Sequence, residues 1–175
     1  MQIDKPGGHK DQMLRQTRAH LVQLSQMADM KANILITASS LVITLSLRFV
    51  TESQLFWPTL VLLVGMAGTA VLAAHAAMPK LRLRRRKAKP RETSDPGFNL
   101  LFFGDFIELS YPRYKAEMEK VLQDDGATYE VQVREVYTMG RYLAKEKYRW
   151  VTYAYLAFIA GILSAAAAFV GSTLI

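Results

Sequence analysis

The sequence predicts an all-α membrane protein with three transmembrane helices and a small, mostly helical cytoplasmic module. Hydrophobic residues make up 51% of the 175 residues, and they gather in long blocks rather than with the period of a soluble core. The block 58–78 holds 21 residues without a formal charge. At ~1.5 Å per residue, such a helix covers the ~30 Å hydrocarbon core of a bilayer. A basic run follows it directly and marks the cytoplasmic side.

Six segments are expected along the chain. They are a cytoplasmic N-terminal helix (1–31), transmembrane helix 1 (32–50), a periplasmic turn (51–57), transmembrane helix 2 (58–79), a cytoplasmic basic linker and helical module (80–149), and transmembrane helix 3 (150–173). Every sizeable basic segment then lies inside. With three spans, the N-terminus is cytoplasmic and the C-terminus periplasmic.

The N-terminal helix is expected from about Asp11 and continues into the first span without a Pro or Gly. Hydroxyl side chains lower the hydrophobicity of this span: Thr37, Ser39, Ser40, Thr44 and Ser46. They can bond to carbonyls of their own helix or to another helix. The span reaches across the bilayer if Arg48 extends its charged end to the interface.

Trp57, the last residue of the expected turn, suits the interface, and Pro58 suits the first turn of the second span. His75, near its cytoplasmic end, is either a proton or ligand site or an interfacial histidine. Small residues four apart predict a face that another helix approaches closely: Gly65, Thr69, Ala73 and Ala77.

The basic run contains a cluster that we expect to face lipid: Arg82, Arg84, Arg85 and Arg86. Directly after a transmembrane helix, a basic cluster anchors the chain to anionic headgroups, at ~1 kcal/mol per charge. Nucleic-acid or phosphate binding is the alternative. The anchor is favoured, and no nucleic-acid partner is expected.

The module after the linker contains two expected helices, one capped by Ser110 and running from 111 to 123, the other capped by Thr128. About fifty residues form a marginal core alone. The module is therefore expected to pack on the N-terminal helix and on neighbouring subunits of a homo-oligomer.

The third span opens with an aromatic belt: Tyr148, Trp150, Tyr153 and Tyr155. It carries two ridges of small residues. One is Ala157, Gly161 and Ala165; the other is Ala160, Ser164, Ala168 and Ser172. Two ridges on one helix predict close contact with more than one neighbour.

The sequence contains no catalytic constellation. Cysteine is absent, and the three histidines (His9, His20 and His75) are scattered, so neither thiolate chemistry nor a histidine metal site is expected. No phosphate-binding glycine loop is present. We therefore expect no enzyme activity, metal or cofactor.

Three strings stand out: Ala28-Asp29-Met30-Lys31-Ala32-Asn33-Ile34-Leu35, then Asn99-Leu100-Leu101-Phe102-Phe103-Gly104-Asp105-Phe106, and then Lys147-Tyr148-Arg149-Trp150. In this order and with this hydropathy, the chain resembles the transmembrane effectors of the Pycsar anti-phage systems (PycTM) over about residues 12–172. The resemblance implies an effector of the bacterial inner membrane. Its ligand would be cyclic UMP or cyclic CMP from a partner pyrimidine cyclase. Activation would impair the membrane and abort infection.

A cyclic nucleotide needs a cation for its phosphate, an aromatic face for its base and polar groups for the base edge. The candidates for ligand binding or signal coupling are Asp29, Lys31, Asn99, Phe103, Asp105, Arg134 and Arg141. Core packing is the alternative for the phenylalanine, and an interfacial pair is the alternative for Asp29 and Lys31. Two other functions stay open: a membrane scaffold or complex subunit without nucleotide binding, and a constitutive small channel subunit.

Overall fold

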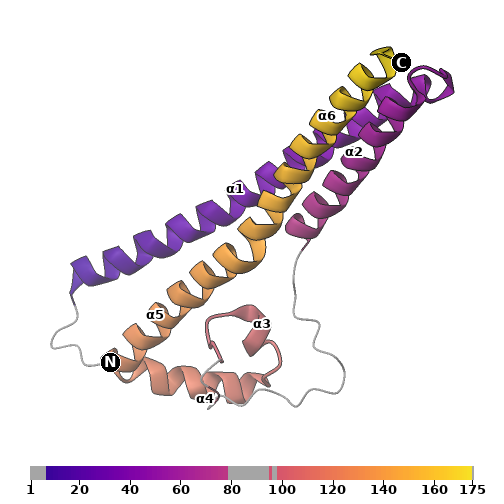
Figure 1. Cartoon of the computed structure of the whole chain (residues 1–175). Coiled ribbons are helices and arrows are strands. Elements are labelled where there is room, and N and C mark those ends of the chain that lie inside the picture. Colours follow the sequence, from indigo (N-terminus) through magenta and orange to yellow (C-terminus); the bar gives the residue numbers. More distant parts are fainter. Residues whose placement is uncertain (1–6, 79–94, 96–97, 175) are drawn as a thin grey trace. The chain divides into compact units, whose positions relative to one another are not determined.

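The computed structural model describes residues 7–78, 95 and 98–174, and its described residues are helical or irregular, with no strand among them. Figure 1 shows the elements in chain order. They are α1 (Gly8–Ser46), the 3-10 helix η1 (Leu47–Thr51), α2 (Phe56–Ala77), α3 (Phe103–Phe106), α4 (Tyr111–Leu122), α5 (Asp125–Tyr142), the π-helix η2 (Leu143–Tyr148) and α6 (Arg149–Leu174). The all-helical fold class is confirmed.

Three helical stretches are long and apolar enough to cross a membrane. They lie within Gly8–Thr51, Phe56–Ala77 and Asp125–Thr173. The three expected membrane helices are therefore present. The segment boundaries given above, and the side of the membrane on which each end lies, stay predictions.

Contacts define two compact units within the chain. The polar unit consists of the described residues of Met1–Gln23 and Pro79–Arg141, and the three-helix unit consists of Leu24–Met78 and Tyr142–Ile175. Helix α1 contributes residues to both units, as its bounds show.

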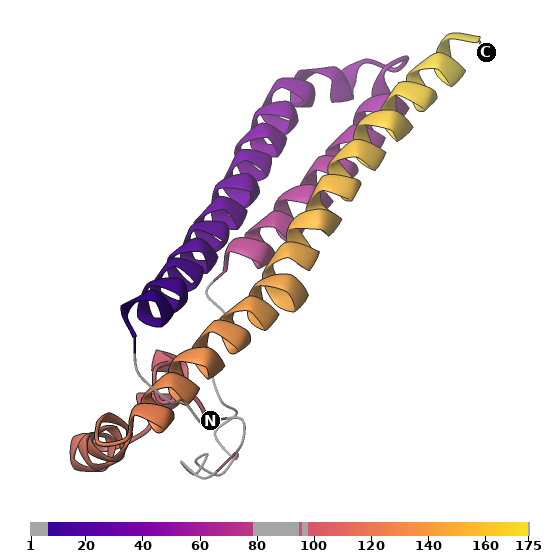
Figure 2. The same cartoon turned by 90° about the vertical axis from the view of Figure 1, so that its left-hand side faces the viewer.

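In the three-helix unit, α2 and α6 run antiparallel and side by side (Figures 1 and 2). They approach most closely at two glycines: a methyl group added to Gly65 would lie 2.6 Å from the Cα of Gly161. Thr69 and Ala73, one and two turns further along α2, are fully buried. The close-approach face predicted from the four-residue spacing of small residues is thus confirmed for these positions.

The core of this unit is built mainly from small side chains. It contains Ala28, Ala32 and Leu35 from α1, Ala73 and Ala76 from α2, and Val151 and Ala154 from α6. Alanines allow three helices to meet with little space between their backbones. On α6, the ridge with Gly161 and Ala165 is buried, whereas Ala160 and Ser164 of the other ridge are exposed. Further along that second ridge, Ala168 is half-buried and Ser172 is exposed.

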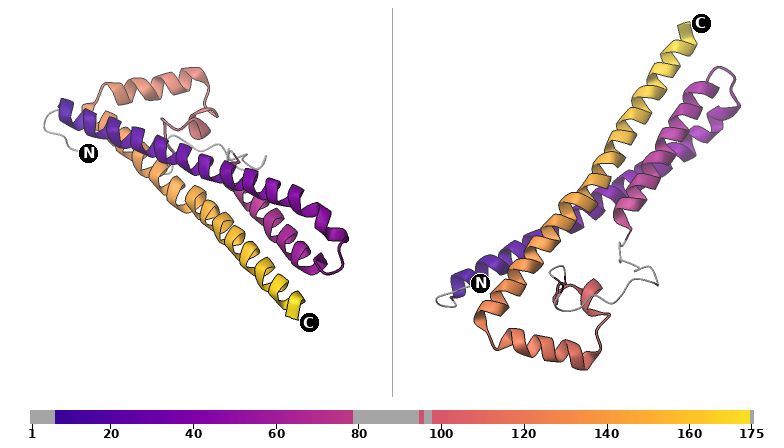
Figure 3. Two further views of the ribbon diagram at one scale, coloured as in Figure 1. Left: turned by 90° about the horizontal axis from the view of Figure 1, so that it is seen from above. Right: turned by 60° about the horizontal axis from the view of Figure 1, so that its bottom comes forward.

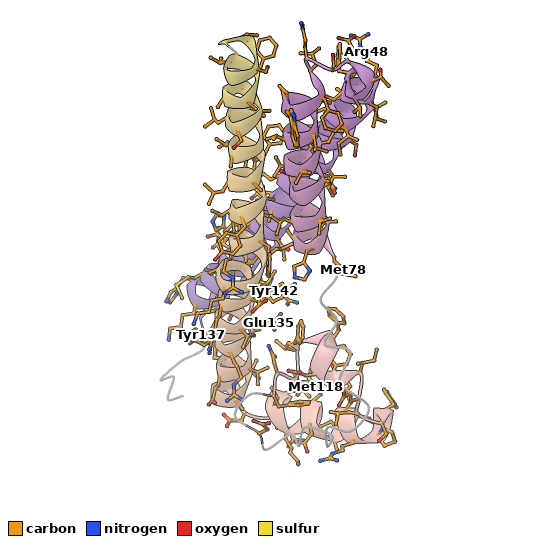
Figure 4. All side chains as sticks on the ribbon, turned by 45° about the vertical axis from the view of Figure 1, so that its right-hand side comes forward. Arg48, Met78, Met118, Glu135, Tyr137 and Tyr142 are labelled. Carbon is orange, nitrogen blue, oxygen red and sulfur yellow. The ribbon has the colours of Figure 1, made fainter. Side chains whose placement is uncertain are left out.

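The two ends of the three-helix unit are distinct. Arg48 lies at one end and Met78 at the other (Figure 4). The C-terminal end of α6 lies at the end that carries the turn between α1 and α2 (Figures 2 and 3). At the opposite end, the rings of His75 and Trp150 meet edge to face, with centroids 4.4 Å apart.

Three local expectations are corrected by the structure. Helix α1 begins at Gly8 rather than at Asp11. Thr128 lies inside α5 rather than before it, because the carboxylate of Asp124 accepts a hydrogen bond from the Gly126 amide (2.8 Å) and starts the helix earlier. Ser110 precedes α4 as expected, but its side chain makes no capping hydrogen bond.

The basic cluster Arg82, Arg84, Arg85 and Arg86 lies outside the described residues.

The glycine contact between α2 and α6 predicts a position-specific effect of alanine. Gly65→Ala should lower the stability of the protein in detergent by about 1–3 kcal/mol, because the new methyl group meets backbone that cannot move aside freely. Gly68→Ala is the matched control on the same helix, since nothing lies within 4 Å of its added methyl group. Thermal unfolding of both variants measures the difference; equal unfolding temperatures would contradict the close contact.

Candidate functional site

The polar unit contains a loop that is fixed to α5 by the side chain of Asn99. Asn99 is only 2% exposed. Its amide nitrogen donates to Glu135 Oε2 (2.5 Å) and Thr138 Oγ1 (3.0 Å), and its Oδ1 accepts from the Leu101 amide (3.0 Å). Both amide hydrogens and the carbonyl oxygen are thus in use within the chain. In this structure the side chain of Asn99 holds the loop in place.

Asp105 and Arg134 extend this network. Asp105 Oδ2 accepts a hydrogen bond from the Asn99 backbone amide (3.1 Å). Arg134 donates to the Phe98 carbonyl (3.4 Å) and to Glu130 Oε1 (3.0 Å). The structure therefore brings together three of the residues predicted from the sequence, and we call Asn99, Asp105, Arg134, Glu135 and Thr138 the loop network.

Sequence reasoning missed Glu135, which lies on α5 (Figure 4) and is 8% exposed. A carboxylate is rarely buried without a partner, because removing it from water is costly. The available signal was its position: four residues after Val131 and three before Thr138, it lies on a face shared with those side chains. That spacing indicates an inward-facing acid, but does not identify Asn99 as its partner.

Two further predicted residues of the polar unit are open to solvent. The Phe103 side chain is 51% exposed, and its ring lies against that of Phe102, with centroids 5.1 Å apart. Arg141 is exposed on α5, two helical turns after Arg134 and on the same face. Neither is enclosed in a core, so the core-packing alternative for Phe103 does not describe its surroundings.

The other predicted pair, Asp29 and Lys31, belongs to the three-helix unit. Asp29 Oδ2 accepts a hydrogen bond from Lys147 Nζ at 2.6 Å. The same ammonium group donates to Ser25 Oγ (2.8 Å) and to the Ser25 carbonyl (3.2 Å), and the lysine side chain is only 11% exposed. Lys31 is exposed. Asp29 is therefore paired with Lys147, not with Lys31.

Lys147 lies in the π-helix η2, next to a second contact with α1. The hydroxyl of Tyr148 donates to the Leu24 carbonyl (3.0 Å). Two consecutive residues of η2 thus bind three residues of α1: the adjacent Leu24 and Ser25, and Asp29 one turn later. A π-helical segment inside a longer helix often accompanies function. We call Ser25, Asp29, Lys147 and Tyr148 the ion-pair cluster.

Taken with the sequence, these features define a class of protein. It is an all-helical membrane protein whose three apolar helices join a polar unit with a fixed loop. Among the described residues, no three His, Asp or Glu side chains are grouped closely enough to hold a metal ion.

The comparisons with known proteins identify the family. A model of the Pycsar effector protein domain matches residues 12–173, and the chain therefore belongs to the Pycsar effector family. No curated protein and no solved structure matches it. Membership supports the role of a membrane effector in anti-phage defence and implies a cyclic-nucleotide signal from a partner cyclase.

The loop network predicts that Asn99→Ala loosens the loop selectively. Glu135 would lose its donor while still buried, a loss of about 1–3 kcal/mol. Hydrogen–deuterium exchange of the full chain in detergent should show faster exchange of the amides at 99–102. Ser110→Ala is the control, because that side chain makes no capping bond, and it should leave exchange unchanged. Unaltered exchange in the Asn99 variant would contradict the network.

The ion-pair cluster predicts that reversed charges compensate each other. Asp29→Lys and Lys147→Asp should each lower the unfolding temperature, since each places like charges at the position of the pair. The double variant should recover part of the loss. Lys31→Asp, an exposed change two residues away, should alter stability by less than about 0.5 kcal/mol. If the double variant unfolds at no higher temperature than the less stable of the two single variants, the ion pair does not contribute to stability.

Proposed function

We propose that the protein responds to a cyclic pyrimidine mononucleotide, cyclic UMP or cyclic CMP, by impairing the bacterial inner membrane. The infected cell would then die before phage matures. The observation that carries this proposal is the family match over residues 12–173, in a chain with three helices apolar enough to cross a bilayer. A partner cyclase would supply the nucleotide.

For the ligand, we propose a site on the exposed side of the polar unit. Arg141 would hold the phosphate, because an exposed guanidinium can donate two parallel hydrogen bonds to it. Phe103 would stack on the base, and its exposed ring face supports that role. Asn99, Asp105 and Arg134 would position the loop that carries Phe103, as their bonds within the chain suggest.

The proposed orientation follows from the distribution of charge. The N-terminus and the region 80–149 would be cytoplasmic, where the nucleotide is made, and the C-terminus would be periplasmic. Arg82, Arg84, Arg85 and Arg86 would bind anionic headgroups of the inner leaflet.

The proposed route of damage is a leak lined by the hydroxyl face of α1, including Ser40 and Thr44. Both side chains are exposed, so they are available to water or to a neighbouring subunit. The nucleotide would open this path by binding the leaking state more tightly than the resting state, since a ligand shifts an equilibrium only through that difference. Asp29 and Lys31 are candidates for coupling the ligand to α1.

Dye leakage from liposomes containing the purified full chain tests the proposal. Cyclic UMP, cyclic CMP, cyclic AMP and cyclic GMP are titrated separately. We expect leakage with one pyrimidine nucleotide and none with the purines. Leakage without any nucleotide would instead indicate a constitutive channel. Failure of all four to bind or to cause leakage would indicate a scaffold or complex subunit.

Variants in the same assay separate binding from leakage. Arg141→Gln should raise the nucleotide concentration needed for leakage by about tenfold or more, because a charged hydrogen bond is lost. Arg113→Gln, an exposed arginine on α4, is its control. Ser40→Leu combined with Thr44→Leu should reduce leakage at saturating nucleotide without changing nucleotide affinity. If leakage is unchanged, these residues do not line the path.

A further inference from the structure

Helix α1 carries a stripe of polar side chains within its apolar stretch. Asn33, Thr37, Ser40 and Thr44 are separated by four, three and four residues. At ~100° per residue these positions fall within ~60° of one another, so they share one face of the helix. All four side chains are exposed. We call these four residues the α1 stripe.

The polar groups of the α1 stripe are mostly unpaired within the chain. Thr44 donates to the Ser40 carbonyl (2.9 Å). Among the described residues, no hydrogen bond is formed by the Asn33 amide or by the hydroxyls of Thr37 and Ser40. By contrast, Thr69 on α2 is buried and donates to the Gly65 carbonyl (2.8 Å). Polar groups without partners are unfavourable in a hydrocarbon environment.

The other two helices present ordinary lipid-facing surfaces. Val64 and Val71 on α2 are 66% and 68% exposed, and Leu163 on α6 is 64% exposed. The α1 stripe is bordered by exposed apolar side chains as well, namely Ile34, Leu41 and Leu45. The α1 stripe is thus a run of four exposed polar residues edged by an apolar ridge, whereas Ser164 on α6 is a single exposed hydroxyl among apolar neighbours.

The same face of α1 carries a shallow, wide-open depression. It runs from Gln26 to Leu41, and Asn33 and Thr37 are among its lining residues. The lining is contributed by α1 alone. Side chains that project from a neighbouring helix pack between the ridges of such a face.

We propose that the α1 stripe is a contact surface between copies of this chain, with the α1 helices parallel. Copies inserted in the same orientation place the same residue at the same depth, so Asn33 meets Asn33 and Thr37 meets Thr37. Amides and hydroxyls both donate and accept hydrogen bonds, so each can pair with its own counterpart. Such side-chain bonds are a recognised source of association between membrane helices.

A second copy fits this surface better than lipid does. Acyl chains offer no donor or acceptor to Thr37 and Ser40, whereas the stripe of another copy offers both. The inference concerns assembly and holds whichever signal the protein receives. It also allows the stripe to serve as the wall of a leak when several copies surround an axis.

Disulfide cross-linking tests the proposal directly, because the chain contains no cysteine. Single substitutions Asn33→Cys, Thr37→Cys and Ser40→Cys are made in the full chain in native membranes and oxidised. Val64→Cys and Val71→Cys, on the exposed face of α2, are the controls. We expect covalent dimers at the stripe positions, several-fold more abundant than at the control positions.

A second measurement guards against loss of folding in any one variant. Energy transfer between labelled copies in liposomes should fall for Thr37→Leu combined with Ser40→Leu, and should persist for Thr37→Ser combined with Ser40→Thr, which keep the hydroxyls. Equal cross-linking at stripe and control positions, or unchanged energy transfer in the leucine variant, would overturn the proposal. Nucleotide-dependent leakage without stripe cross-links would overturn this contact while leaving the proposed function intact.

Discussion

The close approach of Gly65 and Gly161 is the constraint on which the three-helix unit depends. With no side chain between the two backbones, the flanking positions of α2 and α6 come into contact, and Thr69 and Ala73 are fully buried. Lipid provides no hydrophobic force between helices, so their association relies on close packing of small surfaces. The alanines of α1 then pack against the pair, which makes a core with few large side chains.

Packing of small residues leaves the position of α1 along its neighbours weakly defined, because alanine surfaces resemble one another from turn to turn. The ion-pair cluster supplies the missing specificity. Lys147 reaches both Asp29 and Ser25, and Tyr148 reaches the Leu24 carbonyl. These bonds require particular residues at particular heights, so they fix the register of α1 against η2. Small residues thus provide proximity, and polar residues provide register.

The sequence was sufficient for features that depend on local composition. Length and hydropathy predicted the three membrane helices, and a four-residue spacing predicted the face of α2 that contains Gly65. It was insufficient where partners are distant: Asn99 and Glu135 are 36 residues apart, and Asp29 and Lys147 are 118 apart. The predicted start of α5 was wrong because two nearby residues, Asp124 and Thr128, can each cap a helix. The earlier residue, Asp124, does so. The predicted ligand contacts depend on a nucleotide and stay predictions.

Polar side chains on α2 and on α1 differ in burial and in hydrogen bonding. The comparison indicates which helix face is suited to a further polar contact. Thr69 is buried and satisfied by its own helix, so α2 needs nothing from outside. Thr37 and Ser40 are exposed, although a back-bond of the kind made by Thr44 is available to any hydroxyl on a helix. A helix that only faced lipid would gain by satisfying such groups internally. Their outward placement therefore favours a polar neighbour on this face of α1.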